Sequence, residues 1–282
     1  MTILSTASVI ARWGSRKCGI LNRGMRMNQE EPLPPGIYLV ATPIGNLEDI
    51  TLRALRVLAS ADALACEDTR VTRKLFTRHD IPAPQALYSV NDHNERRLAA
   101  KLADLAAGGK VVAYCSDAGM PGVSDPGYHI VRAALEAGVP VDAIPGPSAL
   151  PTAIALSGLA AASFTYFGFP PRRDGRLAAI FRAHGCLRPA LVFYESPRRL
   201  GRLLTLAAEH IDPGREAAVC LELTKKFQRV ERGTLAGLAA RFNEAETRGE
   251  ATVVIEGAEK GAVGNSADED AASDDDDCGD GE

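Results

Sequence analysis

The alternation of short apolar runs with helix-period segments, repeated from residue 36 to residue 257, constrains the fold of this chain most strongly. Gly36 to Ala41 is a continuous apolar run, as expected of a strand buried on both faces of a parallel sheet. Leu52, Leu55 and Leu58 follow at helical spacing, and a second short apolar run begins at Ala63. Strands that alternate with helices in this way predict an α/β fold.

The same pattern predicts two α/β domains. A break near residues 158–163 separates a domain over 36–160 from a domain over 161–257. Further strands are expected over 63–66, 110–115, 139–144, 164–168, 190–194, 217–223 and 251–256. Further helices are expected over 94–107, 126–137, 148–156, 174–183, 197–209 and 234–247.

The two ends of the chain differ from the body in charge. Residues 1–26 carry five basic side chains and no acid, and we interpret 1–35 as a disordered basic extension. A transit peptide, or a start codon upstream of a true start at Met25 or Met27, are the alternatives. Residues 258–282 carry ten acids and one lysine, and such a segment is predicted to be a disordered acidic tail.

The composition of the whole chain narrows the class of protein. No apolar run reaches the roughly 18–20 residues that span a bilayer, so no membrane partner is expected. The six cysteines are scattered without a C-x-x-C pair, which is typical of free thiols in a reducing, cytoplasmic compartment. The five histidines show no metal-ligand spacing, so no metal site is expected.

Two turn-rich segments follow predicted strands of the first domain. In Thr42–Asp49, Gly45 allows the backbone to come close to a partner, and Asp49 is either the cap of the next helix or a site residue. Ser116–Gly127 holds three glycines and two prolines. Its Asp117 could bind a hydroxyl or an ammonium group or could bond its own backbone, while Asp125 is interpreted as a helix cap.

Two more such segments follow later strands. Pro145–Ala149 opens a helix, where the Ser148 hydroxyl and the free N–H groups are suited to a carboxylate. Phe193–Arg199 places Tyr194 and Glu195 at a strand end. Open α/β sheets bind ligands at the carboxyl ends of their strands, so these four segments predict one ligand site.

Taken together, these segments resemble the ribosomal RNA small-subunit methyltransferase I family of the class III, or tetrapyrrole methylase, superfamily. Members of that family share the sequence motifs T-P-I-G-N-L-x-D, E-D-T-R, S-D-A-G-x-P-x-x-S-D-P-G and F-Y-E-S. These motifs stand here at Thr42–Asp49, Glu67–Arg70, Ser116–Gly127 and Phe193–Ser196. The resemblance covers residues 36–257 and implies two α/β domains of the tetrapyrrole methylase type with a cofactor trough between them.

The resemblance also implies a function and a donor site. It implies that S-adenosyl-L-methionine is the cofactor and that its methyl group goes to the 2′-hydroxyl of a cytidine in the decoding region of 16S rRNA. The partner is then 16S rRNA in the small ribosomal subunit, and the protein is expected to be a homodimer. By similarity, the residues expected along the donor are Asp117, Gly119, Ser148, Ala149, Tyr194, Leu221 and Glu222.

The catalytic and RNA-binding residues are less closely defined by the pattern. A base that takes the proton of the ribose hydroxyl would come from Glu67, His93 or Glu195, with Asp68 and Lys225 as further candidates. The alternative for these groups is a structural role, in a salt bridge or in the stabilisation of a turn. Phosphate contacts are expected from basic clusters that include Arg70, Arg73, Arg172, Arg173 and Lys225.

Three other functions remain open at this point. A tetrapyrrole methyltransferase would share the fold, but such enzymes more often show G-x-G-x-G-D in the first turn. A non-catalytic RNA-binding assembly factor could retain the fold, although the intact donor loops argue against it. A dinucleotide-dependent oxidoreductase suits the strand–helix alternation but lacks the glycine fingerprint.

Overall fold

The computed structural model describes residues 32–91, 93–244 and 247–259. The described residues from Pro35 onward belong to one compact unit. Most of the predicted basic extension and acidic tail, together with Cys18 and Cys278, lies outside the described residues. Within the described residues, no helix is both long and apolar enough to cross a membrane.

The first domain is a five-stranded parallel sheet with strand order β3-β2-β4-β1-β5. Its strands are β1 Gly36–Val40, β2 Ala63–Cys66, β3 Ala86–Ser89, β4 Val111–Cys115 and β5 Val141–Ile144. Its helices are η1 Leu47–Asp49, α2 Leu52–Ser60, α3 Thr69–His79, α4 Glu95–Ala107 and α5 Tyr128–Glu136.

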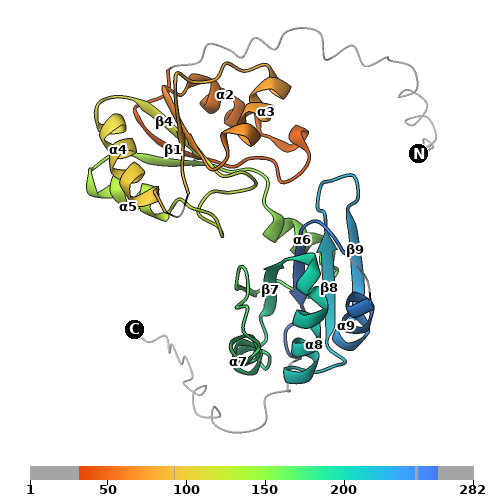
Figure 1. Cartoon of the computed structure of the whole chain (residues 1–282). Helices are drawn as coiled ribbons and strands as arrows, with labels where there is room; N and C mark the ends of the chain where they lie inside the picture. Colours follow the sequence, from red (N-terminus) through yellow and green to blue (C-terminus); the bar gives the residue numbers. More distant parts are fainter. Residues whose placement is uncertain (1–31, 92, 245–246, 260–282) are drawn as a thin grey trace, which may run out of the picture. The chain divides into compact units, whose positions relative to one another are not determined.

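Helices cover both faces of this first sheet (Figure 1). Ile37, Val112 and Tyr114 point to the face on which α4 and α5 pack. On the other face, α2 and α3 bury Val57, Leu58, Leu75 and Phe76. A sheet buried on both faces explains why β1 and β4 read as unbroken apolar runs.

The second domain is a mixed five-stranded sheet with order β6-β7-β10-β8-β9. Its strands are β6 Phe164–Tyr166, β7 Ala190–Glu195, β8 Glu216–Leu221, β9 Arg229–Thr234 and β10 Ala251–Ile255. β6 runs parallel to β7, whereas β10 is antiparallel to both β7 and β8, and β9 is antiparallel to β8. The helices are α7 Asp174–His184, η2 Pro197–Arg199, α8 Leu200–His210 and α9 Leu235–Glu244.

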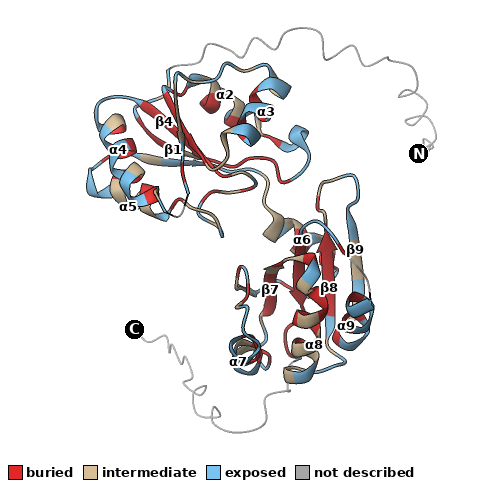
Figure 2. Cartoon of the chain, in the orientation of Figure 1, coloured by how far each residue is buried: buried red, intermediate tan, exposed pale blue. Residues whose placement is uncertain are grey.

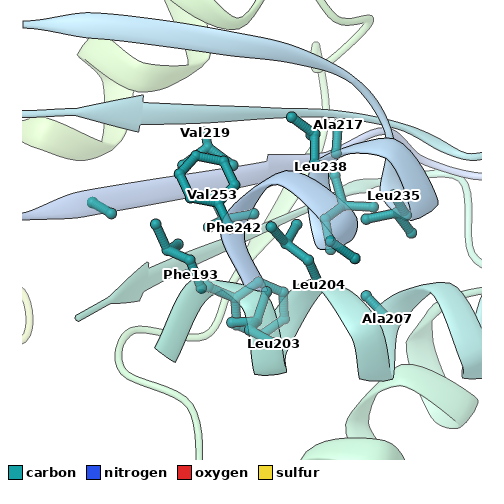
Figure 3. Close-up of a cluster of buried hydrophobic side chains, with 14 of the residues drawn as sticks. Phe193, Leu203, Leu204, Ala207, Ala217, Val219, Leu235, Leu238, Phe242 and Val253 are labelled. Carbon is teal, nitrogen blue, oxygen red and sulfur yellow. The ribbon is translucent and has the colours of Figure 1, made fainter. Parts of the chain in front are cut away.

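The main core of this domain lies between the sheet and helices α7, α8 and α9. Leu203, Leu204 and Phe242 pack against Phe193 and Val253 of the sheet (Figure 3). Figure 2 shows the buried residues on the strands and on the inward sides of the helices. This core holds the end of β7 and the start of α8 in fixed positions, and the site depends on both.

Helix α6 (Ala149–Ser157) covers the opposite face of the second sheet. Its Ala153 packs with Val192, Cys220 and Val254, although its chain position led us to count it with the first domain. The helix therefore begins at the carboxyl end of β5 and ends against the second sheet. The boundary near residue 160 stays a prediction.

Two helix starts differ from the sequence prediction. Thr51, rather than Asp49, caps α2, because its side chain accepts from the N–H of Ala54 at 3.1 Å. Helix α5 begins at Tyr128, and Asp125 is not its cap. The caps come from another helix: Oε1 of the buried Glu95 accepts the N–H groups of Gly127 and His129, each at 2.9 Å.

Candidate functional site

A cavity of about 380 Å³ gathers three of the four turn-rich segments and Ile44 of the first. The loop after β4 lines it with residues 118–120 and 123–125, and the start of α6 adds Ser148 and Ala149. The second domain adds the end of β7 and residues 249–252. The sequence prediction that these segments form one site therefore agrees with the cavity.

The loop after β4 is held rigidly at the cavity. Gly119 has φ +87, a left-handed conformation that favours glycine, and exchanges two backbone hydrogen bonds with Thr42 at 2.9 and 3.0 Å. Ser124 is also left-handed, with φ +64. The bonds from Glu95 fix the far end of the loop at Gly127. Few degrees of freedom are left to freeze when a ligand binds.

The start of α6 offers an anion site to this cavity. Ser148 is the residue before the helix, its side chain makes no capping bond, and the first turn contains no acid. The N–H groups of a first helical turn lack partners within the helix, and the helix dipole favours negative charge there. A ligand carboxylate would meet both features.

Hydroxyl groups connect the two domains beside this helix start. The oxygens of Ser124 and Tyr166 lie 2.6 Å apart, and the ring of Tyr166 packs edge-on against that of Tyr194, with the ring centroids 5.1 Å apart. Tyr194 and Ser148 both line the cavity. Burial raises the pKa of the Tyr194 phenol, so this hydroxyl stays neutral at physiological pH and orients rather than deprotonates.

Asp125 is a carboxylate of the cavity wall that the sequence interpretation assigned to a cap. Burial raises its pKa from 3.8 to about 6, the nearby Asp117 adds to the rise, and a hydrogen bond with Ser116 opposes it. A carboxylate with a pKa near neutrality is mostly ionised at pH 7 and still basic enough to accept a proton. The sequence Ser124-Asp125-Pro126 resembles a helix start, which is why the sequence analysis interpreted Asp125 as a cap.

Glu195 lies at the same cavity but is tied to an arginine. Its side chain is 1% exposed, and its Oε1 accepts from the N–H of Ser196 at 2.6 Å and from Nε of Arg199 at 2.7 Å. Its Oε2 is buried without a hydrogen bond among the described residues. The ion pair fixes the turn between β7 and α8 at the cavity rim.

The structure brings together four of the seven predicted donor residues: Gly119, Ser148, Ala149 and Tyr194 all line the cavity. Asp117 lines a neighbouring cavity of about 210 Å³, which shares Ile44 and Ala118 with the first, and its Oδ1 accepts from the N–H of Asp68. Leu221 is buried in β8. Glu222 instead binds Lys225 and the N–H of Glu250.

The other predicted bases lie away from this cavity. Glu67 accepts from the Ser89 hydroxyl through its backbone oxygen, and His93 lies in the exposed turn before α4. Asp68 caps α3 and binds Arg70, and its hydrogen bonds with Arg70 lower its pKa to about 2. Burial opposes charge on Lys225, but hydrogen bonds with Glu222 and Glu250 outweigh it and raise the pKa of the ammonium.

The predicted RNA contacts divide into cations with and without a salt bridge to another residue that the structure describes. Arg73, Arg172 and Arg173 are exposed. Arg70 is also exposed but forms a salt bridge with Asp68 at 2.6 Å. Lys225 is held between Glu222 at 3.0 Å and Glu250 at 3.1 Å. Contacts with phosphate are therefore expected mainly from the first three, and all five assignments stay predictions.

The comparisons with known proteins agree with the motifs. Residues 36–239 match the family model of the tetrapyrrole (corrin/porphyrin) methylases. A protein of Mesorhizobium japonicum named ribosomal RNA small subunit methyltransferase I is 46% identical over 81% of this chain and 77% of its own length. Its namesake in Thermotoga maritima is 40% identical over 79% and 99%.

The chain belongs to the ribosomal RNA small subunit methyltransferase I family. Among solved structures, it resembles uroporphyrin-III C-methyltransferase of Thermus thermophilus complexed with S-adenosyl homocysteine, with a TM-score of 0.55 and 25% identity over 78% of this chain and 97% of that one. The fold prediction, two α/β domains of the tetrapyrrole methylase type, is therefore confirmed.

Proposed function

We propose that this chain is an S-adenosylmethionine-dependent methyltransferase that methylates the ribose 2′-hydroxyl of a cytidine in the decoding region of 16S rRNA. Membership of the ribosomal RNA small subunit methyltransferase I family supports rRNA methylation. The S-adenosyl homocysteine bound to the Thermus thermophilus relative supports the donor. A ribosomal substrate would make the cytoplasm the place of reaction.

The cavity beside the start of α6 is the single observation that carries this proposal. It combines an uncapped helix start for the donor carboxylate with the apolar side chains Ile44, Met120 and Val123, which suit a thioether and a purine ring. The residues that line this cavity therefore fit S-adenosylmethionine. When bound, it would supply a methyl group attached to a good leaving group.

The rigid walls would supply most of the rate by orientation. Holding the ribose oxygen in line with the methyl carbon and the sulfur is worth about 7–11 kcal/mol in well-oriented systems. The bonds of Gly119 with Thr42 and of Glu95 with Gly127 hold one wall, and the Glu195–Arg199 pair holds the other. Both walls are set before substrate arrives.

Asp125 is the base that we propose for the ribose hydroxyl. Its carboxylate lines the cavity, and burial raises its pKa toward neutrality. When the ribose oxygen bonds to the methyl carbon and the carbon–sulfur bond breaks, with S-adenosylhomocysteine as the leaving group, this carboxylate would take up the hydroxyl proton. A positioned base adds typically about 10²–10⁴-fold to the rate.

RNA binding in this proposal comes from exposed cations outside the cavity. Arg73, Arg172 and Arg173 would contact phosphates, which fix the position of the RNA without reading its sequence. The homodimer stays a prediction, because the structure describes a single chain.

The proposal is tested by incubating the protein with labelled S-adenosylmethionine and with small ribosomal subunits that lack the modification. We expect label in 16S rRNA as a 2′-O-methylated cytidine. Uroporphyrinogen or another tetrapyrrole as the sole methyl acceptor would favour the tetrapyrrole enzyme instead. Donor-independent RNA binding without any transfer would favour an assembly factor.

A further inference from the structure

A second cavity in the C-terminal domain is lined, among the residues that the structure describes, by three arginines and no acid. Its volume is about 470 Å³, and it lies among η2, the start of α8, the end of α9 and residues 247–248. The arginines are Arg198, Arg202 and Arg248, which come from separate parts of the chain. The family motifs described above include none of them.

Two of these arginines have guanidinium groups that are available to bind an anion. Arg198 and Arg248 are exposed and have no salt bridge with any residue that the structure describes. Arg202 differs, because it binds Asp174 and donates to the backbone oxygen of Arg172 at 2.8 Å. Arg202 thus anchors the basic segment at Arg172 to the cavity, and the other two guanidinium groups remain for an anion.

The floor of this cavity is packed closely enough to keep its shape. A Cβ on Gly201 would lie 2.2 Å from Oδ1 of Asn243, so only glycine lets α9 approach α8 this closely. Nδ2 of Asn243 donates to the Thr205 hydroxyl at 3.1 Å, which fixes the amide.

The arginine cavity lies directly beside the cavity proposed for the donor. Ser196 and Gly249 line the donor cavity, while Arg198 and Arg248 line the arginine cavity a few residues away on the same two segments. The first segment follows β7 and the second precedes β10, and these two strands are paired at Glu195 and Ala251. Successive groups of one RNA strand could occupy the two cavities together.

We infer that Arg198 and Arg248 bind a phosphodiester of the substrate RNA next to the ribose that is methylated. Guanidinium groups bind phosphate through paired, charge-assisted hydrogen bonds, and two of them on one phosphate hold it in a fixed orientation. The contact positions the sugar and reads no base. This inference rests on the proposed function, because the phosphate is assigned to the same RNA strand as the reacting ribose.

The double variant R198A/R248A tests the inference, with R132A/R182A as the control that removes the same charge from exposed helix positions. Binding of unmethylated small subunits is measured between about 50 and 200 mM salt, together with methyl transfer and donor binding. We expect the dissociation constant and the KM for subunits to rise at least about tenfold. We expect the salt slope to fall by about 0.7, the value for one phosphate on single-stranded RNA.

The same experiment separates this inference from the proposed function. Donor affinity and kcat at saturating subunits should stay near wild type, since a lost positioning contact acts mainly through KM. If R198A/R248A binds subunits with the same affinity and the same salt slope as the control, the inference is overturned, even if the wild type methylates the ribose. If the wild-type protein binds subunits without methylating them, the proposed function is overturned. The comparison of R198A/R248A with the control in RNA binding then decides whether these arginines contact a phosphate.

Discussion

The backbone N–H of Asn46 donates a 3.1 Å hydrogen bond to the hydroxyl of Thr224, which is 178 positions away in the chain. This bond joins the first turn of the N-terminal domain to the loop that follows β8. Thr224 is left-handed, with φ +62, so its loop is bent toward the turn. Gly45 makes the approach possible, as the sequence predicted, and the partner is this chain's own loop.

Gly45→Ala tests that approach. The added Cβ would lie 2.8 Å from the Thr224 hydroxyl oxygen and 3.0 Å from the backbone oxygen of Leu223. We expect a loss of about 1–3 kcal/mol in the free energy of unfolding and weaker donor binding, because Ile44 of the same turn lines the cavity. Gly175→Ala is the control, since nothing lies within 4 Å of its Cβ position. Equal urea midpoints for the two variants would contradict the packing argument.

Asp125→Asn tests the proposed base. In wild type, kcat should fall as the pH drops through about 6, where Asp125 takes up a proton. The variant should lose about 10²–10⁴-fold in kcat and show no inflection near pH 6. Asp104→Asn, at an exposed position on α4, is the control. A wild-type profile that is flat between pH 5 and 7 would reject Asp125 as the base.

The stability of the wild type should change with pH in the sense opposite to its kcat. It should fall as Asp125 ionises, whereas Asp125→Asn lacks this dependence. The folded-state pKa of Asp125 lies above its ordinary value of 3.8, so the native protein binds the proton more tightly. Ionisation therefore lowers wild-type stability as the pH rises from about 4 to about 6. The variant should melt at a higher temperature than wild type at pH 7.5, and calorimetry should show this advantage vanish near pH 4.

Glu195→Gln separates orientation from proton transfer. Because Oε1 of Glu195 is occupied by Arg199 and Ser196, the amide should weaken the turn and lower the unfolding temperature. The inflection of kcat near pH 6 should persist. Its disappearance in this variant alone would return the role of base to Glu195.

Glu95→Ala tests how the loop after β4 is held. Removal of the carboxylate leaves the N–H groups of Gly127 and His129 without their acceptor in a buried place. We expect a loss of about 2–4 kcal/mol and weaker donor binding. Glu95→Gln keeps an acceptor oxygen and should recover a large part of both. Urea denaturation with an unchanged m-value would measure the difference.

Much of this fold could be predicted because its central strands are buried on both faces. β1, β4, β7 and β10 read as apolar runs, and each was expected within a few residues. Of the four edge strands, β5 and β6 were expected, whereas β3 and β9 gave no such signal. β3 is only half-buried, and β9 carries Arg229, Glu231 and Arg232 in six residues, so neither was predicted. α3 was also missed, since it has five basic residues among eleven.

The site was predictable where backbone geometry demands special residues. Gly119 and Ser148 stand in turns whose composition marks them, and both line the cavity. Asp125 was missed because Ser-Asp-Pro resembles a helix start, whereas the cap comes from Glu95, thirty positions earlier. Arg248 was missed because no local pattern distinguishes it, and the tertiary structure, in which β7 pairs with β10 and α8 packs against α9, brings it to the same cavity as Arg198.

The position of the transferred methyl group tests the account most directly. A methyl group on a ribose 2′-oxygen prevents alkaline cleavage of the following phosphodiester, because that hydroxyl is the attacking group. Small-subunit RNA treated with this protein and S-adenosylmethionine should yield one alkali-resistant dinucleotide that begins with cytidine, and Asp125→Asn should yield almost none. Label found only on a base, or no label in the RNA at all, would contradict the account.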